Sequence, residues 1–171
     1  PTKAGLKGFL PRPPKVILPT AIATNAPITT IHQGIVAGRL KASRTPVTIA
    51  DQFEIASAAT STEEIGNPVY PPARRKLAEH GISCNGKTAR QITRHDYDHY
   101  DYIVAMDANN MRNLSRMLGE DKQHKISLLL NYTDHHRDVA DPWYTGNFEA
   151  TWQDVNDGCR GLLEKVMQDL K

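Results

Sequence analysis

The segment YIVAMD, residues 102–107, is followed almost at once by NNMRNLSRML, residues 109–118, and these two segments indicate the fold. The first is apolar at successive positions, which is typical of a strand buried on both faces. The second places Met111, Leu114 and Leu118 on one side of a helix. A buried strand that leads into an amphipathic helix predicts a parallel sheet covered by helices.

Other segments repeat this alternation of apolar strand and helix. Strands are expected at FEIASAAT (53–60), KISLLLNY (125–132) and KVIL (15–18), and helices at IHQGIVAGRL (31–40), PPARRKLAEH (71–80) and from 147 to 170. Pro71 and Pro72 suit a first helical turn, and Gly81 suits its end. The sequence therefore predicts an α/β fold: a single doubly wound domain over residues 1–171, with a four-stranded parallel sheet and helices on both faces.

Composition limits the classes of protein. A chain of 171 residues is long enough for one domain. Its two cysteines, Cys84 and Cys159, are too few for a disulfide framework, which favours a reducing compartment and hence the cytoplasm. The apolar runs fall short of the roughly 18 residues of a membrane helix, and Pro19 interrupts the run that most resembles a signal sequence. We expect no membrane partner.

Residues 1–50 differ from the rest of the chain. They contain no Asp or Glu, seven Lys and Arg, and seven of the 11 prolines. A basic arm that binds nucleic acid is one interpretation. The bases are scattered, however, without interleaved aromatic residues, so an atypical leading segment is favoured and no nucleic-acid partner is predicted.

Chemistry is expected where parallel strands end, because ligands of such folds bind beyond the carboxyl ends of the strands. One candidate segment is DVADPWYTGNF, residues 138–148. Asp141 stands immediately before Pro142, and Trp143 and Tyr144 follow. A carboxylate beside an aromatic wall suits a general acid that protonates an aryl leaving group. The alternative is an ordinary surface turn.

Residues 53–165 resemble the low-molecular-weight protein tyrosine phosphatases. The resemblance rests on SAATST, EIGNPVYPPAR, ARQIT, DYIVAMDANN, KISLLL and ADPWYTGNF, which follow the order and spacing of that family. It implies that Asp141 is the general acid, that Trp143 and Tyr144 flank the phosphotyrosine ring, and that Ser57 and Asp107 support the phosphate loop. It also implies catalysis without metal or cofactor, a phosphotyrosine-containing protein or small aryl phosphate as partner, and a monomer or weak dimer.

The nucleophile is not found where the resemblance places it. CNGKTAR, residues 84–90, has the spacing of a Cys-x5-Arg phosphate loop, but it follows a helix rather than the first strand, so we reject it. In the expected place, the segment TAIATNAPITT, residues 20–30, has no cysteine, arginine or glycine. Thr20 stands nearest the expected position of the cysteine, and its hydroxyl has no candidate base there. The nucleophile is therefore unknown.

Two hypotheses remain open. The first is a phosphotyrosine phosphatase whose working loop is not represented by residues 1–50. The second is a pseudophosphatase, a binding module that keeps the fold and the aromatic residues Trp143 and Tyr144 at the entrance of the site but not the chemistry. In either case Glu63 and Glu64, in the loop after SAATS, are expected to disfavour acidic peptides. His135 and His136 are interpreted as solvated side chains rather than metal ligands.

Overall fold

The computed structural model describes residues 14–20 and 53–169. Four strands form one parallel sheet in the order β2-β1-β3-β4, with β1 at Lys15–Thr20, β2 at Glu54–Ala59, β3 at Tyr102–Ala105 and β4 at Ile126–Leu128. The helices are α2 (Pro71–Glu79), α3 (Arg94–His99), α4 (Ala108–Leu118), α5 (Pro142–Thr145) and α6 (Phe148–Asp169), with a 3-10 helix, η2, at Leu129–Tyr132. The predicted helix at 31–40 lies outside the described residues, as do residues 1–13 and 21–52.

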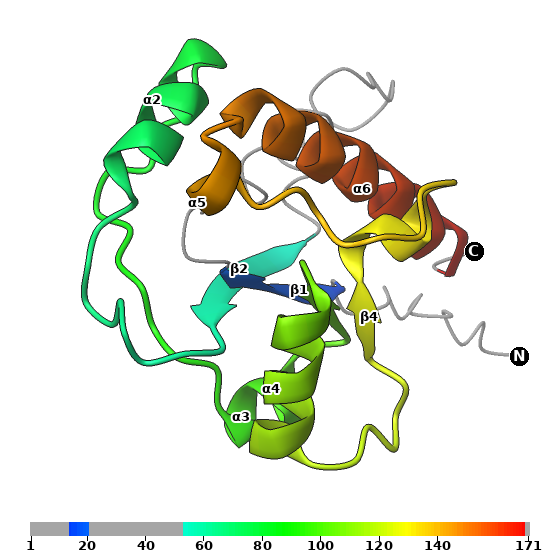
Figure 1. Cartoon of the computed structure of the whole chain (residues 1–171). Helices are drawn as coiled ribbons and strands as arrows, with labels where there is room; N and C mark the ends of the chain where they lie inside the picture. Colours follow the sequence, from blue (N-terminus) through cyan, green and yellow to red (C-terminus); the bar gives the residue numbers. More distant parts are fainter. Residues whose placement is uncertain (1–13, 21–52, 170–171) are drawn as a thin grey trace, which may run out of the picture.

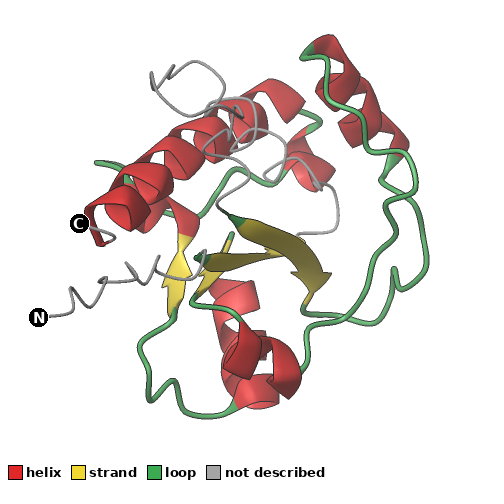
Figure 2. Ribbon diagram, turned by 180° about the vertical axis from the view of Figure 1, so that it is seen from behind, coloured by secondary structure: helices red, strands yellow, loops and turns green. Residues whose placement is uncertain are grey.

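Helices cover both faces of this sheet (Figures 1 and 2). Helices α5 and α6 lie on one face, and α3 and α4 lie on the other. Successive residues of β3 serve the two faces in turn: Val104 packs with Leu162 and Val166 of α6, whereas Ile103 packs with Leu114 of α4. The observed sheet confirms the predicted α/β fold with a doubly wound, four-stranded parallel sheet. The prediction succeeds because the central strands are apolar on both faces, as a sheet covered by helices requires.

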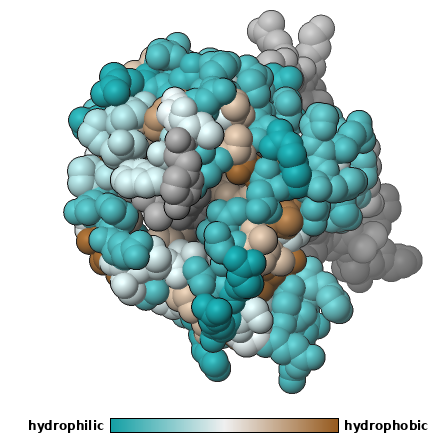
Figure 3. Space-filling model, viewed as in Figure 1, coloured by the Kyte–Doolittle hydropathy of each residue, from teal (hydrophilic) through white to brown (hydrophobic). Residues whose placement is uncertain are grey.

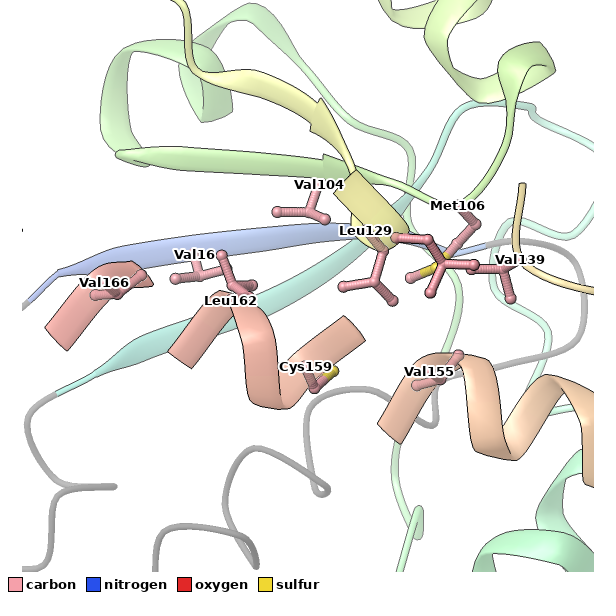
Figure 4. Close-up of a cluster of buried hydrophobic side chains, with 10 residues drawn as sticks. Val16, Val104, Met106, Leu129, Val139, Val155, Cys159, Leu162 and Val166 are labelled. Atoms are coloured by element: carbon pink, nitrogen blue, oxygen red, sulfur yellow. The ribbon is translucent and has the colours of Figure 1, made fainter. Parts of the chain in front are cut away.

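The larger core cluster fills the space between the sheet and α6 (Figure 4). Val16 of β1 and Val104 of β3 face Leu162 and Val166, and Val155 and Cys159 continue the same side of α6. A third, smaller cluster lies beneath α2, where Ala73 and Leu77 pack with Val69, Ile82 and Cys84 and contact Phe148 and Trp152 of α6. Helix α6 therefore joins the sheet to α2.

The predicted strand at 125–132 is wrong in its second half. Only Ile126–Leu128 pairs with β3, and Leu129–Tyr132 turns into η2. Both Leu129 and Leu130 are fully buried, so the apolar run reflects burial rather than strand pairing. Gly158 and Gly161 of α6 let the two helices approach, because an added Cβ at Gly161 would collide with the carbonyl oxygen of Tyr132.

Local signals explain several helix ends. Asp107 caps α4 by accepting a hydrogen bond from the amide of Asn110 (2.6 Å). Helix α3 begins with a capping box in which Thr93 is the N-cap residue and Asp96 is its partner in the first turn. Asp96 is buried, and its carboxylate also pairs with Arg90. In the described residues, no helix combines the length and apolarity that crossing a bilayer requires.

Candidate functional site

The order of the strands places the candidate site. Strand β1 is followed along the chain by β2 on one side of it, and β3 then pairs on the other side. Such a reversal opens a crevice at the carboxyl ends of β1 and β3, where ligands of doubly wound folds bind. Thr20 is the last residue of β1 and pairs in register with Ala59. The segment that follows Thr20 lies outside the described residues.

Ser57 and Asp107, the two residues predicted to support a phosphate loop, lie on either side of β1. Ser57 is on β2, in register with Leu18 of β1. Asp107 follows β3 and caps α4. The side chain of Asn110 in turn accepts a hydrogen bond from the amide of Met106 (3.3 Å) and so stabilises the turn from β3 into α4. Whether they support a phosphate loop stays a prediction.

The segment 137–141, called here the acid loop, lies against the carboxyl end of β3. The amide of Val139 donates a hydrogen bond to the carbonyl oxygen of Met106 (2.9 Å), and Figure 4 shows these two side chains together. The carboxylate of Asp138 accepts a bond from the amide of Ala108 at the start of α4 (3.1 Å). Both contacts bring Asp141 to the edge of the sheet that carries the crevice.

Asp141 is exposed and caps α5, a four-residue helix that was not predicted from the sequence. Its Oδ1 atom accepts a hydrogen bond from the main-chain amide of Trp143 (2.8 Å). Pro142 occupies the first helical position, where a missing amide hydrogen costs nothing. One carboxylate oxygen of Asp141 is thus fixed by its own helix, which orients the other oxygen.

Trp143 is 55% exposed, and its ring lies beside that of Tyr70, with centroids 5.5 Å apart. Tyr70 immediately precedes α2 and also approaches Phe148 at 6.3 Å. Tyr144 follows Trp143 on α5. The exposed large hydrophobic side chains of the described part are Ile65, Tyr70 and Trp143. The face of the molecule in Figure 3 is mostly hydrophilic. Tyr70 thus lies next to a predicted site residue, and the sequence did not predict this neighbour.

Asp154 of α6 was also missed. It is buried and holds Arg137 and Ala140 of the acid loop by hydrogen bonds. Burial raises the pKa of Asp154, but the bonds from Arg137 and the amide of Ala140 outweigh that effect and hold the pKa below its ordinary value. The available signal was its spacing, since Asp154 falls among the buried positions Thr151, Val155 and Gly158 of the same helix.

A model of the low molecular weight phosphotyrosine protein phosphatase family matches residues 33–171. The chain belongs to this family. This match begins at residue 33, whereas the resemblance based on the motifs begins at residue 53.

Relatives and solved structures agree with this family. The chain is 40% identical over 115 residues to the low molecular weight protein-tyrosine-phosphatase YfkJ of Bacillus subtilis, covering 66% of this chain and 74% of the relative. It is 38% identical over 123 residues to the low molecular weight phosphotyrosine protein phosphatase of Rattus norvegicus, covering 69% and 77%. The crystal structure of YfkJ superposes with a TM-score of 0.76 at 31% identity, over 92% of this chain and 96% of that chain.

Neither cysteine of this family member is placed as a nucleophile. Cys84 is buried in the cluster beneath α2. Cys159 lies on α6 within the core (Figure 4), and burial raises its pKa to about 12. A buried thiol with a raised pKa supplies almost no thiolate at neutral pH. The described residues therefore contribute a general-acid candidate and an aromatic wall, but both of their cysteines lie in core clusters and not at the crevice.

An open pocket of about 350 Å³ lies beside the site, between the loop after β2 and α4. Its lining includes Ser61, Glu63, Asn113 and Arg116, whereas Asp141 and Trp143 are not part of it. Glu64 is turned to Asn67, whose side-chain amide donates a bond to it (2.8 Å). Glu63 is thus the acid that the pocket presents. Within residues 14–20 and 53–169, no three His, Cys, Asp or Glu side chains converge as metal ligands.

Proposed function

We propose that the protein binds phosphotyrosine-containing proteins or small aryl phosphates in the crevice at the carboxyl ends of β1 and β3. Asp141 acts there as general acid, and Trp143 and Tyr144 flank the aromatic ring. The observation that carries this proposal is the bond between Val139 and Met106, which holds the acid loop at the end of β3, next to the central strand β1. Family membership supports the same assignment.

The proposed reaction is the hydrolysis of a phosphotyrosyl ester through a phosphocysteine intermediate. A thiolate attacks phosphorus, the bond from phosphorus to the tyrosyl oxygen breaks, and Asp141 gives its proton to that oxygen. Water then attacks the phosphorus of the phosphocysteine and gives a proton to the ionised Asp141, and the bond from phosphorus to sulfur breaks. This step releases phosphate and restores both the thiolate and the protonated acid. An arginine that holds two equatorial oxygens and a nest of main-chain amides would bind the phosphoryl group in both steps.

This reaction needs a Cys-x5-Arg loop directly after β1. Residues 20–30 of this chain have neither residue, and Thr20 offers only a hydroxyl in the place of the thiol. We therefore propose that hydrolysis belongs to a form of the protein whose first 50 residues carry that loop. We expect the chain with the printed sequence to be inactive.

A second candidate is a pseudophosphatase that recognises phosphotyrosine without cleaving it. The missing cysteine and arginine favour it, because the described part of the site would remain without the nucleophile. Binding would be weak, since the strongest anion contacts are absent. This candidate and the first differ only in what precedes residue 53.

The decisive experiment joins intact mass and N-terminal sequencing of the purified protein to an assay with p-nitrophenyl phosphate at mildly acidic pH. Activity that falls in the Asp141→Ala variant, with a mass that departs from this chain, supports the phosphatase. A matching mass without turnover supports the pseudophosphatase. Turnover that Asp141→Ala leaves unchanged contradicts the assignment of the acid.

A chimera tests the described part directly. Residues 1–50 are replaced by the N-terminal segment of a family member whose first strand is followed by a Cys-x5-Arg loop. The chimera should hydrolyse p-nitrophenyl phosphate, and both a Cys→Ser change in the new loop and Asp141→Ala should remove most of that activity. A folded but inactive chimera would contradict the proposed function.

The remaining assignments are proposals of the same kind. We propose one domain over residues 1–171, a cytoplasmic location, catalysis without metal or cofactor, and a monomer or weak dimer. Size-exclusion chromatography with light scattering tests the last of these. Activity that survives a chelator supports the proposal that no metal takes part.

A further inference from the structure

The acid loop is attached to two parts of the molecule. Its first attachment is to the carboxyl end of β3, through Val139, and to the start of α4, through Asp138. The second attachment is to α6, which binds Ala140, the residue immediately before Asp141. The carbonyl oxygen of Ala140 accepts a hydrogen bond from the hydroxyl of Thr151 (2.6 Å), and the amide of Ala140 donates one to Asp154 (2.9 Å).

Asp154 is the centre of the second attachment. Its carboxylate also accepts two bonds from the guanidinium of Arg137, at 2.7 and 2.6 Å. The side chain of Asp154 is 11% exposed, whereas that of Arg137 is 52% exposed. One buried carboxylate thus binds both the first residue of the acid loop and the residue that precedes Asp141.

The geometry at Asp141 gives this attachment a consequence for catalysis. The main chain of Asp141 continues directly from Ala140, whose amide and carbonyl oxygen are both hydrogen-bonded to side chains of α6. Beyond Asp141, the carboxylate caps α5 through Trp143. The direction of the carboxylate therefore depends on where α6 fixes Ala140. A general acid must lie within hydrogen-bond reach of the leaving oxygen, and a misplacement of about 1 Å can cost about 100-fold in rate.

We propose that Asp154 is the positioning residue of the general acid: through Arg137 and Ala140 it fixes the acid loop on α6 and so aims Asp141 at the leaving-group oxygen. The catalytic part of this inference rests on the proposed function. The attachment itself is a property of the chain and is tested without catalysis.

The first test is amide hydrogen exchange, followed by mass spectrometry, on the full chain. Asp154→Asn should raise the exchange rate of peptides from residues 137–147 at least tenfold and leave β3 and α4 unchanged. Asp157→Asn is the matched control, because Asp157 is exposed on the same helix. Wild-type protection of residues 137–147 in Asp154→Asn would overturn the proposal.

Arg137→Gln covers the case in which Asp154→Asn unfolds the whole chain. It removes the two guanidinium bonds from the exposed side of the pair and keeps the bond from Ala140 to Asp154. Faster exchange confined to residues 137–147 supports the proposal. Unchanged exchange there would overturn it.

The second test uses the active chimera and two substrates, phenyl phosphate and p-nitrophenyl phosphate. Phenol is the poorer leaving group, so loss of acid catalysis slows phenyl phosphate more. We expect Asp154→Asn to lower kcat for phenyl phosphate at least tenfold more than for p-nitrophenyl phosphate, as Asp141→Ala does, with no difference in Asp157→Asn. An equal loss on both substrates would overturn the positioning role.

The two tests separate the two proposals. If Asp141→Ala slows both substrates equally, the assignment of Asp141 as general acid fails. The exchange result then still decides whether Asp154 anchors the acid loop. If Asp141→Ala shows the expected dependence and Asp154→Asn does not, only the positioning role fails.

Discussion

Arg90 donates two hydrogen bonds to the carboxylate of Asp96, at 2.9 and 2.8 Å, and this pair explains what the CNGKTAR segment does. Asp96 is buried at the first turn of α3, and it also accepts bonds from the amide and hydroxyl of Thr93. The guanidinium is therefore committed to the start of α3, while Cys84 lies in the cluster beneath α2. The spacing of a phosphate loop is present here without its structure.

The first prediction concerns this pair. Arg90→Gln should lower the free energy of unfolding by about 1–3 kcal/mol, because it leaves a buried carboxylate without its cation. Urea unfolding at pH 7 measures the change. Arg94→Gln, at an exposed position on α3, is the control and should change it by less than about 0.5 kcal/mol. Inorganic phosphate should shift the midpoints of wild type and Arg90→Gln equally; a shift lost only in Arg90→Gln would revive the rejected loop.

A second prediction concerns stability at acid pH. The pKa of Asp154 and that of Asp96 are both held below the ordinary value, in spite of burial, by hydrogen bonds from Arg137 and Arg90. Groups with a lowered folded pKa stabilise the fold above their unfolded pKa, and that stability is lost as pH falls through the folded pKa. The loss should therefore begin below about pH 4.

Urea unfolding at pH 7, 5 and 3 measures this loss. Asp154→Asn should be less stable than wild type at pH 7 and should lose less stability between pH 5 and pH 3. His135 also faces Asp154 and favours its charged form, so His135→Gln is tested in parallel. An equal pH dependence in wild type and Asp154→Asn would contradict the prediction.

The third prediction concerns the contact between α6 and η2. Gly161→Ala should lower the free energy of unfolding by about 2–3 kcal/mol, because the new methyl group meets the main-chain carbonyl of Tyr132, which cannot move alone. Gly158→Ala should cost less, since there the methyl group meets the side chain of Leu129. Thermal and urea unfolding measure both variants. A larger cost for Gly158→Ala would contradict this account of the packing.

The fourth prediction concerns the aromatic wall. In the active chimera, Tyr70→Ala should raise KM for aryl phosphates about threefold to tenfold, because Trp143 loses an aromatic partner that contributes about 0.5–1.5 kcal/mol. The value of kcat should change little, since Tyr70 does not contact the acid loop by any described hydrogen bond. Tyr70→Phe should keep the wild-type KM. If Tyr70→Phe weakens binding as much as Tyr70→Ala, the hydroxyl rather than the ring is responsible.

The fifth prediction concerns peptide charge. Glu63 lines the pocket beside α4, whereas Glu64 is bonded to Asn67. Glu63→Gln in the chimera should therefore improve kcat/KM for acidic phosphopeptides relative to neutral ones, about twofold to fivefold at low salt, and Glu64→Gln should do less. High salt should reduce the difference. Unchanged preferences in both variants would show that neither charge selects peptides.

Much of the fold could be predicted from the pattern of apolar residues and from the prolines and glycines that begin and end helices. The apolar runs located all four strands, and Pro71 and Gly81 marked α2, because these signals act over a few residues. The division of residues 125–132 into β4 and η2 could not be predicted, since Leu129 and Leu130 are equally apolar in a strand and in a buried turn. Helix α5 was missed because a four-residue helix has no periodicity to detect.

The candidate site divides in the same way. Asp141, Trp143 and Tyr144 could be named in advance because they are adjacent in sequence and belong to a segment that resembles a known family. Asp154 and Tyr70 could not, because each acts on a residue distant in the chain: Asp154 on Arg137 and Tyr70 on Trp143. Their positions carried only the weak signal of a polar residue at a buried helical spacing or an aromatic residue before a helix.

The sequence by itself determined the parallel α/β class, the family and the absence of a Cys-x5-Arg motif after the first strand, because each of these is written in local order and composition. Only the tertiary structure decided that the guanidinium of Arg90 pairs with Asp96 and does not act with Cys84. It also decided that α6 binds the acid loop through Asp154. Such pairings depend on which distant segments the sheet brings together. A side chain chooses its partner from what lies within a few ångströms in space, and spacing along the chain does not report that distance.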